Sequence, residues 1–212
     1  MGVRIWDLPV RLFHWSLVLL VPALWWTAET ERMELHILLG EVMLGLLLFR
    51  LLWGLLGSST ARFASFVRGP RAVLRYFREK KRALGHSPLG GWSVIAMLLA
   101  LSVQTGLGLF ASDEDGIYAG PLSRHMPDLD SAHELAERHE TLFWVIVALI
   151  ALHVLAILYY RLISREDLIT PMVTGRGPPG EAGEAMVPAP LWRFLLAAGL
   201  ATGLTFVITM IL

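Results

Sequence analysis

The chain has 212 residues, with 18 lysines and arginines against 18 aspartates and glutamates, and it contains no cysteine. Apolar residues make up 55% of it and charged residues 17%, whereas about 25% of an ordinary soluble domain is charged. A single core of this size could not bury such long apolar runs, so the composition indicates a membrane protein. The lack of cysteine excludes disulfides, thiolate-bound iron–sulfur clusters, cysteine zinc sites and covalently attached c-type haem. Any redox cofactor must therefore be held non-covalently.

Five stretches are long and apolar enough to cross a membrane as helices, which requires about 20 residues each. They lie at roughly 9–27, 36–57, 91–111, 140–161 and 191–212. The first follows two arginines, but no small-residue cleavage site precedes the acidic Glu29. We therefore expect it to be a retained span and not a removed signal peptide. The fold class predicted from this pattern is an all-α integral membrane protein with five spans.

The connections between the spans differ in charge. The tip between the second and third spans carries eight basic residues and one acidic residue, whereas the segment between the third and fourth carries seven acidic and two basic residues. Because basic loops stay on the cytoplasmic side, we expect a cytoplasmic N-terminus and a C-terminus on the opposite side of the membrane. This orientation puts 15 basic and 6 acidic residues inside, and 3 basic and 12 acidic residues outside. A short loop between spans has a sufficient reason to be basic, so no nucleic-acid partner is expected.

Four histidines lie within or at the edge of the predicted spans, where ionisable groups are costly and usually functional. His14 and His153 share a level near the cytoplasmic side, and His36 and His139 share a level near the outer side. On an ideal helix, the 14 residues between His139 and His153 correspond to about 21 Å and to within about 40° of a whole number of turns. These two histidines therefore occupy one helix face at two heights. His133 falls on the opposite face.

Facing imidazoles at two levels are what two bis-histidine haems would require. A zinc or iron transport path is the main chemical alternative. Such a path would require carboxylate ligands clustered with the histidines, and such a cluster is lacking. Histidines that only stabilise helix packing are a further alternative. Four glycines within the spans either make room for a flat porphyrin or allow close helix packing; they are Gly40, Gly45, Gly106 and Gly108.

Three further polar residues leave alternatives open. Arg50 either approaches the inner haem or, as we favour, extends to the cytoplasmic headgroups. His86 either assists quinone protonation, since histidine ordinarily titrates near neutral pH, or has no role. Gln104 either binds a quinone or, as we favour, donates a hydrogen bond to a neighbouring helix.

Several short motifs occur together in a specific order. They are Arg4-Ile5-Trp6-Asp7, Arg11-Leu12-Phe13-His14-Trp15, His36-Ile37-Leu38-Leu39-Gly40 and His86-Ser87-Pro88-Leu89-Gly90-Gly91-Trp92, followed by His139 and His153. Over about residues 3–165 the chain resembles the bacterial cytochrome b-561 family, which includes the cytochrome b subunits of nickel-iron hydrogenases.

The resemblance implies a four-helix transmembrane bundle over residues 1–165 that holds two non-covalent b-type haems. It also implies a multi-pass protein of the bacterial inner membrane, so the C-terminus would be periplasmic. His14 and His153 would ligate the cytoplasmic haem, and His36 and His139 the periplasmic one. A Gly/Pro-rich linker at 166–190 and a fifth, C-terminal span at 191–212 would follow. The resemblance leaves the role of that fifth span open.

Two haems at two levels predict electron transfer across the bilayer. We expect an electron-transfer protein or a subunit of a quinone-linked oxidoreductase, most simply the cytochrome subunit of a respiratory complex. It would connect the quinone pool with a periplasmic hydrogenase or c-type cytochrome docked on the acidic segment 112–138. Arg11, Arg32 and Arg138 are possible haem-propionate contacts, or else interfacial anchors. The alternatives are a stand-alone quinone reductase that oxidises a small reductant such as superoxide, and a non-redox metal transporter or scaffold.

Overall fold

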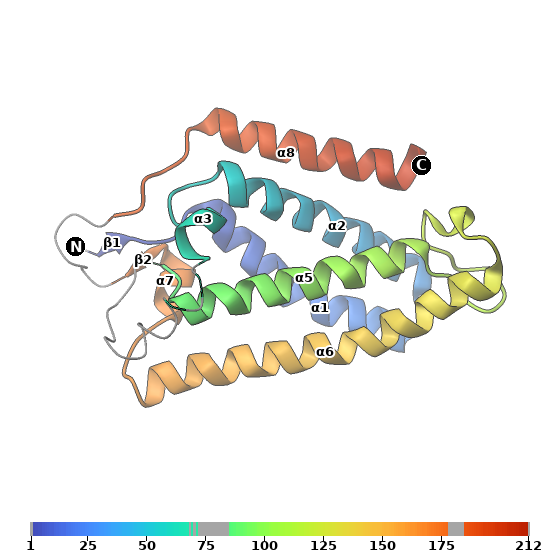
Figure 1. The fold of residues 1–212 in the computed structure, drawn as a ribbon, viewed down its shortest axis with the longest axis horizontal. Helices are drawn as coiled ribbons and strands as arrows, with labels where there is room; N and C mark the ends of the chain where they lie inside the picture. The colour runs from blue at the N-terminus through green and yellow to red at the C-terminus, as the bar shows by residue number, and fades with distance from the viewer. Residues whose placement is uncertain (1, 68, 70, 72–84, 178–184, 212) are drawn as a thin grey trace. The chain divides into compact units, whose positions relative to one another are not determined.

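The computed structural model describes residues 2–67, 69, 71, 85–177 and 185–211 (Figure 1). Its long helices are α1 (Leu8–Glu29), α2 (Met33–Leu56), α5 (Pro88–Phe110), α6 (Leu129–Leu162) and α8 (Leu191–Phe206). The short elements are β1 (Val3–Arg4), α3 (Phe63–Phe66), η1 (Ser123–His125), α7 (Ile169–Thr174), β2 (Arg176–Gly177) and η2 (Val207–Ile211). Six of the eight basic residues of the predicted cytoplasmic tip lie outside the described residues: Arg68, Arg75, Arg78, Lys80, Lys81 and Arg82.

Among the described residues, five helices are long and apolar enough to cross a membrane, which confirms the predicted number of spans. Their mean hydropathy lies between 1.5 and 2.7, and η2 extends the last of them to Ile211. Helix α6 begins well before the predicted span because Asp128 caps its first turn, where the Ser131 amide donates to the carboxylate over 2.7 Å. Hydrogen bonds from Ser131 lower the pKa of Asp128.

Packing divides the chain into two compact units, and each long helix contributes one part to each unit. Unit 1 comprises Met1–His14, Arg50–Ala96 and Leu149–Ala197, and unit 2 comprises Trp15–Phe49, Met97–Ala148 and Ala198–Leu212. His14 and His153 belong to unit 1, whereas His36 and His139 belong to unit 2. Each predicted pair therefore lies within one unit.

In unit 1, Asp7 ties the start of α1 to the end of α2. One of its carboxylate oxygens accepts from the Val10 amide over 2.8 Å and so caps α1. The other accepts from the indole Nε1 of Trp53 over 2.9 Å. The Thr60 hydroxyl donates to the Ile5 carbonyl over 2.7 Å and holds the N-terminal segment from the other side.

The same unit contains a small two-stranded sheet that the sequence did not predict. Strands β1 and β2 pair antiparallel, with Arg4 opposite Arg176. The turn between α7 and β2 requires glycine, because Gly175 has a φ of +79° and a Cβ there would lie 2.9 Å from the Trp6 carbonyl. Figure 1 shows β1, β2 and α7 together at the end where the N-terminus lies. The segment predicted as a linker, 166–190, thus contains structured elements.

Unit 2 is built on apolar side chains from α1, α2, α5 and α6. Its buried residues include Leu20, Met43, Leu47, Leu101 and Ile146. The connection between α5 and α6 folds back on itself through an isolated bridge between Ser112 and Ala119. This bridge lies between the end of α5 and the start of α6, the two helices that carry residues of the candidate site.

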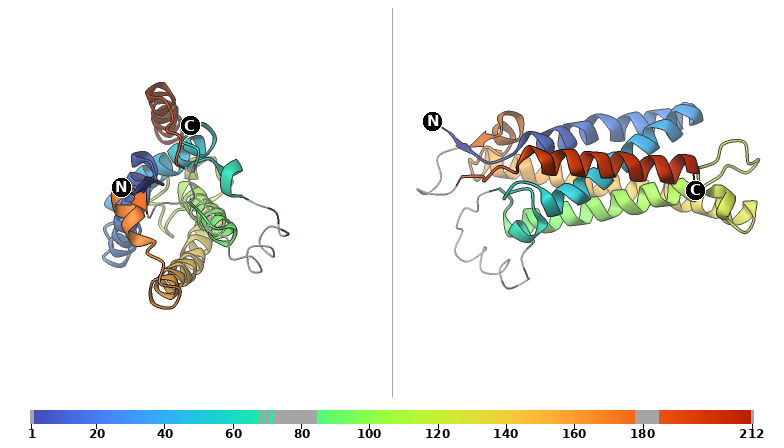
Figure 2. Two further views of the ribbon diagram at one scale, coloured as in Figure 1. Left: turned by 90° about the vertical axis from the view of Figure 1, so that its left-hand side faces the viewer. Right: turned by 90° about the horizontal axis from the view of Figure 1, so that it is seen from above.

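Helix α8 lies beside α2 (Figure 2). In unit 1, the Phe194 ring packs edge-on against Trp53 at 6.1 Å. In unit 2, a Cβ on Gly45 would lie 3.3 Å from the Thr205 hydroxyl oxygen. Gly45, which the sequence offered as a possible haem contact, therefore accommodates α8 through its lack of a side chain.

Candidate functional site

His36 on α2 and His139 on α6 face each other in unit 2. Their ring centres are 6.1 Å apart and their planes form an angle of 80°. Both side chains are half-buried. The pairing predicted from depth and helical phase is therefore present in the structure.

Hydrogen bonds set the orientation of both rings. The Nδ1–H group of His36 donates to the Leu24 carbonyl over 2.9 Å, and that of His139 donates to the Gln104 carbonyl over 2.8 Å. Because a carbonyl oxygen can only accept, Nδ1 carries the proton and Nε2 carries the lone pair in each neutral ring. A carbonyl that holds Nδ1 while Nε2 binds the metal is the usual arrangement around metal-ligating histidine.

Two polar side chains support these rings from behind. The Gln104 amide donates from Nε2 to the His139 carbonyl over 2.9 Å, which joins α5 to α6. This confirms the helix-contact interpretation of Gln104. The Thr27 hydroxyl donates to the Leu24 carbonyl over 2.9 Å and lies 3.3 Å from Nδ1 of His36. Thr27, which is fully buried, was not identified from the sequence.

His14 on α1 and His153 on α6 form the second pair, in unit 1. Their ring centres are 6.5 Å apart and their planes form an angle of 57°. Both rings are half-buried. This pair also agrees with the prediction from depth.

The spacing of both pairs fits two imidazoles on opposite sides of one iron. Metal–imidazole bonds are about 2.0 Å long and the ring centre lies about 1 Å further out, so the two ring centres should be about 6 Å apart. The observed distances are 6.1 and 6.5 Å. Among the described residues, no group of three or more His, Cys, Asp and Glu side chains could hold a metal ion. The donor set thus fits an iron whose remaining ligands come from a macrocycle better than a tetrahedral zinc site.

Glycines border the pair in unit 2. A Cβ on Gly108 would lie 3.0 Å from Cε1 of His139, so the lack of a side chain at Gly108 leaves room for this ring. Gly40 and Gly106 have no atom within 4 Å of a Cβ position.

A buried arginine and a half-buried histidine lie in the same unit as the second pair. Arg50 is only 3% exposed, and its guanidinium lies 4.8 Å from the centre of the Phe63 ring. The favoured expectation that it extends to the headgroups is therefore wrong. His86 packs between Trp6 and Phe66, with ring centres 4.6 Å from each.

The environment of His86 disfavours its charged form. Burial, followed by the charges of Arg50 and His153, lowers the pKa of His86 to about 3. A role for His86 in quinone protonation stays a prediction. Within the described part of the chain, Nδ1 of His86 and Nη1 of Arg50 are buried and have no hydrogen-bond partner.

The three arginines predicted as propionate contacts all have protein partners. Arg11 donates through Nη2 to the Val173 carbonyl. Arg32 lies over the Trp26 ring, 4.8 Å from its centre, and Arg138 pairs with Glu134 one turn earlier on α6. Their role toward a haem stays a prediction.

The structure is therefore that of a helical membrane protein with two histidine pairs spaced for axial ligation of iron. The chain belongs to the prokaryotic cytochrome b561 family, whose model matches residues 5–175. Membership implies b-type haem and a part in electron transport.

Two curated proteins illustrate the similarity, and each is described as a probable Ni/Fe-hydrogenase B-type cytochrome subunit. One, from Bradyrhizobium diazoefficiens, is 22% identical over 213 residues, which cover 82% of this chain and 85% of the relative. The other, from Azotobacter chroococcum, is 24% identical over 210 residues, which cover 82% and 88%. No solved structure gives a significant match.

Proposed function

We propose that this protein binds two b-type haems and carries electrons across the bilayer between the quinone pool and a periplasmic redox partner. The observation that carries the proposal is the pair of facing histidines in each unit, with ring centres 6.1 and 6.5 Å apart. His14 and His153 would hold one iron, and His36 and His139 the other. The charge asymmetry of the sequence supports a cytoplasmic N-terminus and a periplasmic C-terminus.

A bound haem supplies reversible one-electron reduction of its iron. The chain's own residues set the conditions for that chemistry. Two histidines on each iron would leave no site for oxygen or peroxide, and this would favour electron transfer over chemistry on a small ligand. The carbonyls of Leu24 and Gln104 accept hydrogen bonds from the Nδ1–H groups of His36 and His139, which would make the Nε2 atoms of both rings more basic ligands for an iron.

Arg50 and His86 are the best-placed propionate contacts in unit 1. Buried polar atoms without partners are uncommon and costly in native proteins, and each of these residues has one such atom within the part of the chain that the structure describes. His86 interacts electrostatically with Arg50 and with the candidate ligand His153. A haem carboxylate at this place would accept from both donors and balance the arginine charge. Nε of Arg11 is also buried without a partner among the described residues, but this arginine already donates through Nη2 to the Val173 carbonyl.

A larger respiratory complex accounts best for the outer segment. Residues 112–138 are acidic, and Ile117 is 70% exposed among these charges. Exposed apolar residues within a charged rim are typical of a docking surface. The names of the relatives support a hydrogenase as the partner, and a c-type cytochrome would fit the same surface.

The experiment is transmembrane electron transfer in proteoliposomes that contain trapped ferricyanide. External dithionite should reduce the trapped ferricyanide through the wild-type protein and through His125→Ala, a variant outside both pairs. His36→Ala and His153→Ala should each abolish the transfer, because each variant removes a proposed ligand of one of the two haems. Transfer that persists in both variants would exclude the proposed route. Reduction of the haems by a short-chain ubiquinol in the same vesicles tests the quinone link.

A further inference from the structure

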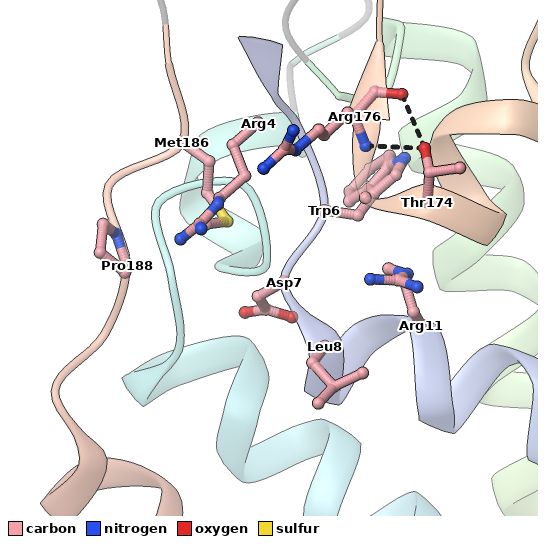
Figure 3. Close-up of a pocket in the computed structure, with 10 residues that line it drawn as sticks. Arg4, Trp6, Asp7, Leu8, Arg11, Thr174, Arg176, Met186 and Pro188 are labelled. Carbon is pink, nitrogen blue, oxygen red and sulfur yellow. Dashed lines mark hydrogen bonds between the residues drawn. The ribbon is translucent and has the colours of Figure 1, made fainter. Parts of the chain in front are cut away.

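Three arginines surround a pocket in unit 1 at the N-terminal end of α1 (Figure 3). Its volume of about 340 Å³ falls within the range of about 300–1,000 Å³ that is usual for small-molecule sites. Arg4 comes from β1, Arg11 from α1 and Arg176 from β2, so three separate elements bring positive charge to one place. The neighbouring wall is formed by Trp6, Asp7 and Leu8.

The sheet register places two of these charges directly opposite each other. Arg4 and Arg176 are cross-strand partners in the antiparallel pair. Like charges in this position destabilise a sheet. Among the described residues, no carboxylate forms an ion pair with Arg4, Arg11 or Arg176. An anion bound between the Arg4 and Arg176 guanidinium groups would attract both of them and offset their mutual repulsion.

Arg11 and Asp7, the other two charged residues of the pocket, already make hydrogen bonds within the protein. Arg11 donates through Nη2 to the Val173 carbonyl, while its Nε is buried without a hydrogen-bond partner in the described part of the chain. The one carboxylate, Asp7, accepts from the Val10 amide and from Trp53. The pocket therefore has three guanidinium groups and one carboxylate, and that carboxylate already accepts two hydrogen bonds. Nε of Arg11 is a buried donor without a partner among the described residues.

We propose that this pocket binds the phosphate headgroup of an anionic phospholipid. Arg4 and Arg176 would hold the phosphate between them, and Nε of Arg11 would donate from the α1 side. The pocket borders the start of a membrane-spanning helix, where Leu8 is 57% and Leu12 58% exposed. This lets the acyl chains lie along α1 while the headgroup occupies the pocket. The proposal does not depend on haem.

The test is lipid binding to the detergent-solubilised holoprotein, followed by native mass spectrometry and by the thermal unfolding midpoint. The probes are dioleoylphosphatidylglycerol and the zwitterionic dioleoylphosphatidylcholine. We expect the anionic lipid to bind more tightly and to raise the midpoint. Each arginine replaced should weaken its binding about fivefold, so Arg4→Gln/Arg176→Gln should lose more than tenfold. Arg62→Gln, an exposed arginine of the same unit, should bind like the wild type.

Two further measurements keep a folding defect apart from a binding defect. Arg4→Lys/Arg176→Lys keeps both charges and should retain most of the binding. Without lipid, Arg4→Gln should unfold at a higher temperature than the wild type, because it removes the repulsion with Arg176. Equal binding of the anionic lipid by wild type and Arg4→Gln/Arg176→Gln would overturn the proposal. Inorganic phosphate that displaces the lipid and raises the midpoint equally would show a soluble oxyanion site, and would overturn the lipid assignment.

Discussion

Gln104 and His139 each bind the backbone carbonyl of the other. The Gln104 amide donates to the His139 carbonyl over 2.9 Å, and Nδ1 of His139 donates to the Gln104 carbonyl over 2.8 Å. This reciprocal contact fixes α5 against α6 at the height of a candidate iron ligand. It also fixes the ring tautomer, so helix packing and the orientation of the candidate ligand depend on the same two residues.

Replacing Gln104 by leucine should separate these two effects. Gln104→Leu removes the side-chain donor but keeps the backbone carbonyl that orients His139. We expect a loss of about 1 kcal/mol in the free energy of unfolding, with two haems per chain retained. Thermal unfolding and haem quantitation measure the two results. Loss of one haem in this variant would show that the side chain itself holds the ligand.

Gly108 should tolerate a bulky side chain poorly. A Cβ there would lie 3.0 Å from His139 Cε1, and the larger Gly108→Val should displace the ring and remove one of two haems. Gly199→Val is the matched control, because a Cβ at Gly199 meets no atom within 4 Å. Equal haem content in the two variants would contradict the assigned role of Gly108. The pyridine haemochrome spectrum gives the count.

Asp7 should be important for the stability of unit 1. Asp7→Ala removes the cap of α1 and leaves the Trp53 indole without its acceptor. We expect a loss of about 2–3 kcal/mol in the free energy of unfolding. Trp53 should lose intensity or shift in its fluorescence at a lower temperature than in the wild type. Asp7→Asn, which keeps an acceptor oxygen, should lose less; a loss equal to that of the alanine variant would refute this account.

Arg50 should affect one haem selectively. A buried positive charge favours the reduced state of a nearby iron, so Arg50→Gln should lower the midpoint potential of the haem held by His14 and His153. The other potential should change little. A redox titration followed at the haem absorbance separates the two steps, with Arg62→Gln as the control. An unchanged pair of potentials would argue against Arg50 as a propionate contact.

The first turn of α6 should depend on pH through Asp128. Hydrogen bonds from Ser131 lower the pKa of Asp128 below its ordinary 3.8. The folded state therefore binds this proton less readily than the unfolded state, so the stabilisation is complete above pH 3.8 and is lost as pH falls through the lowered pKa. Hydrogen exchange at the Ser131 amide should accelerate over that range. Asp128→Asn should show no such dependence.

Much of the architecture could be predicted because a membrane-spanning helix requires a long run of apolar residues, and such runs can be recognised in the sequence. The five spans follow from runs of about 20 apolar residues. The histidine pairs follow from depth and from the helical phase of His139 and His153. Both arguments use positions along single helices, which the sequence contains directly.

Contacts between distant segments could not be predicted in this way. The burial of Arg50 depends on Phe63, and the packing of His86 depends on Trp6 and Phe66. The sheet between β1 and β2 joins residues more than 170 positions apart in the chain. Neither hydropathy nor periodicity describes such pairings. The same holds for the Leu24 carbonyl that orients His36.

The central claim is that each histidine pair holds one haem. The most direct measurement is the ratio of haem to protein, from pyridine haemochrome spectra, in the purified wild type, His36→Ala and His153→Ala. We predict two b-type haems per chain in the wild type and about one in each variant, with the remaining haem still low-spin. A folded wild type without haem, or a variant that keeps both, would contradict the account.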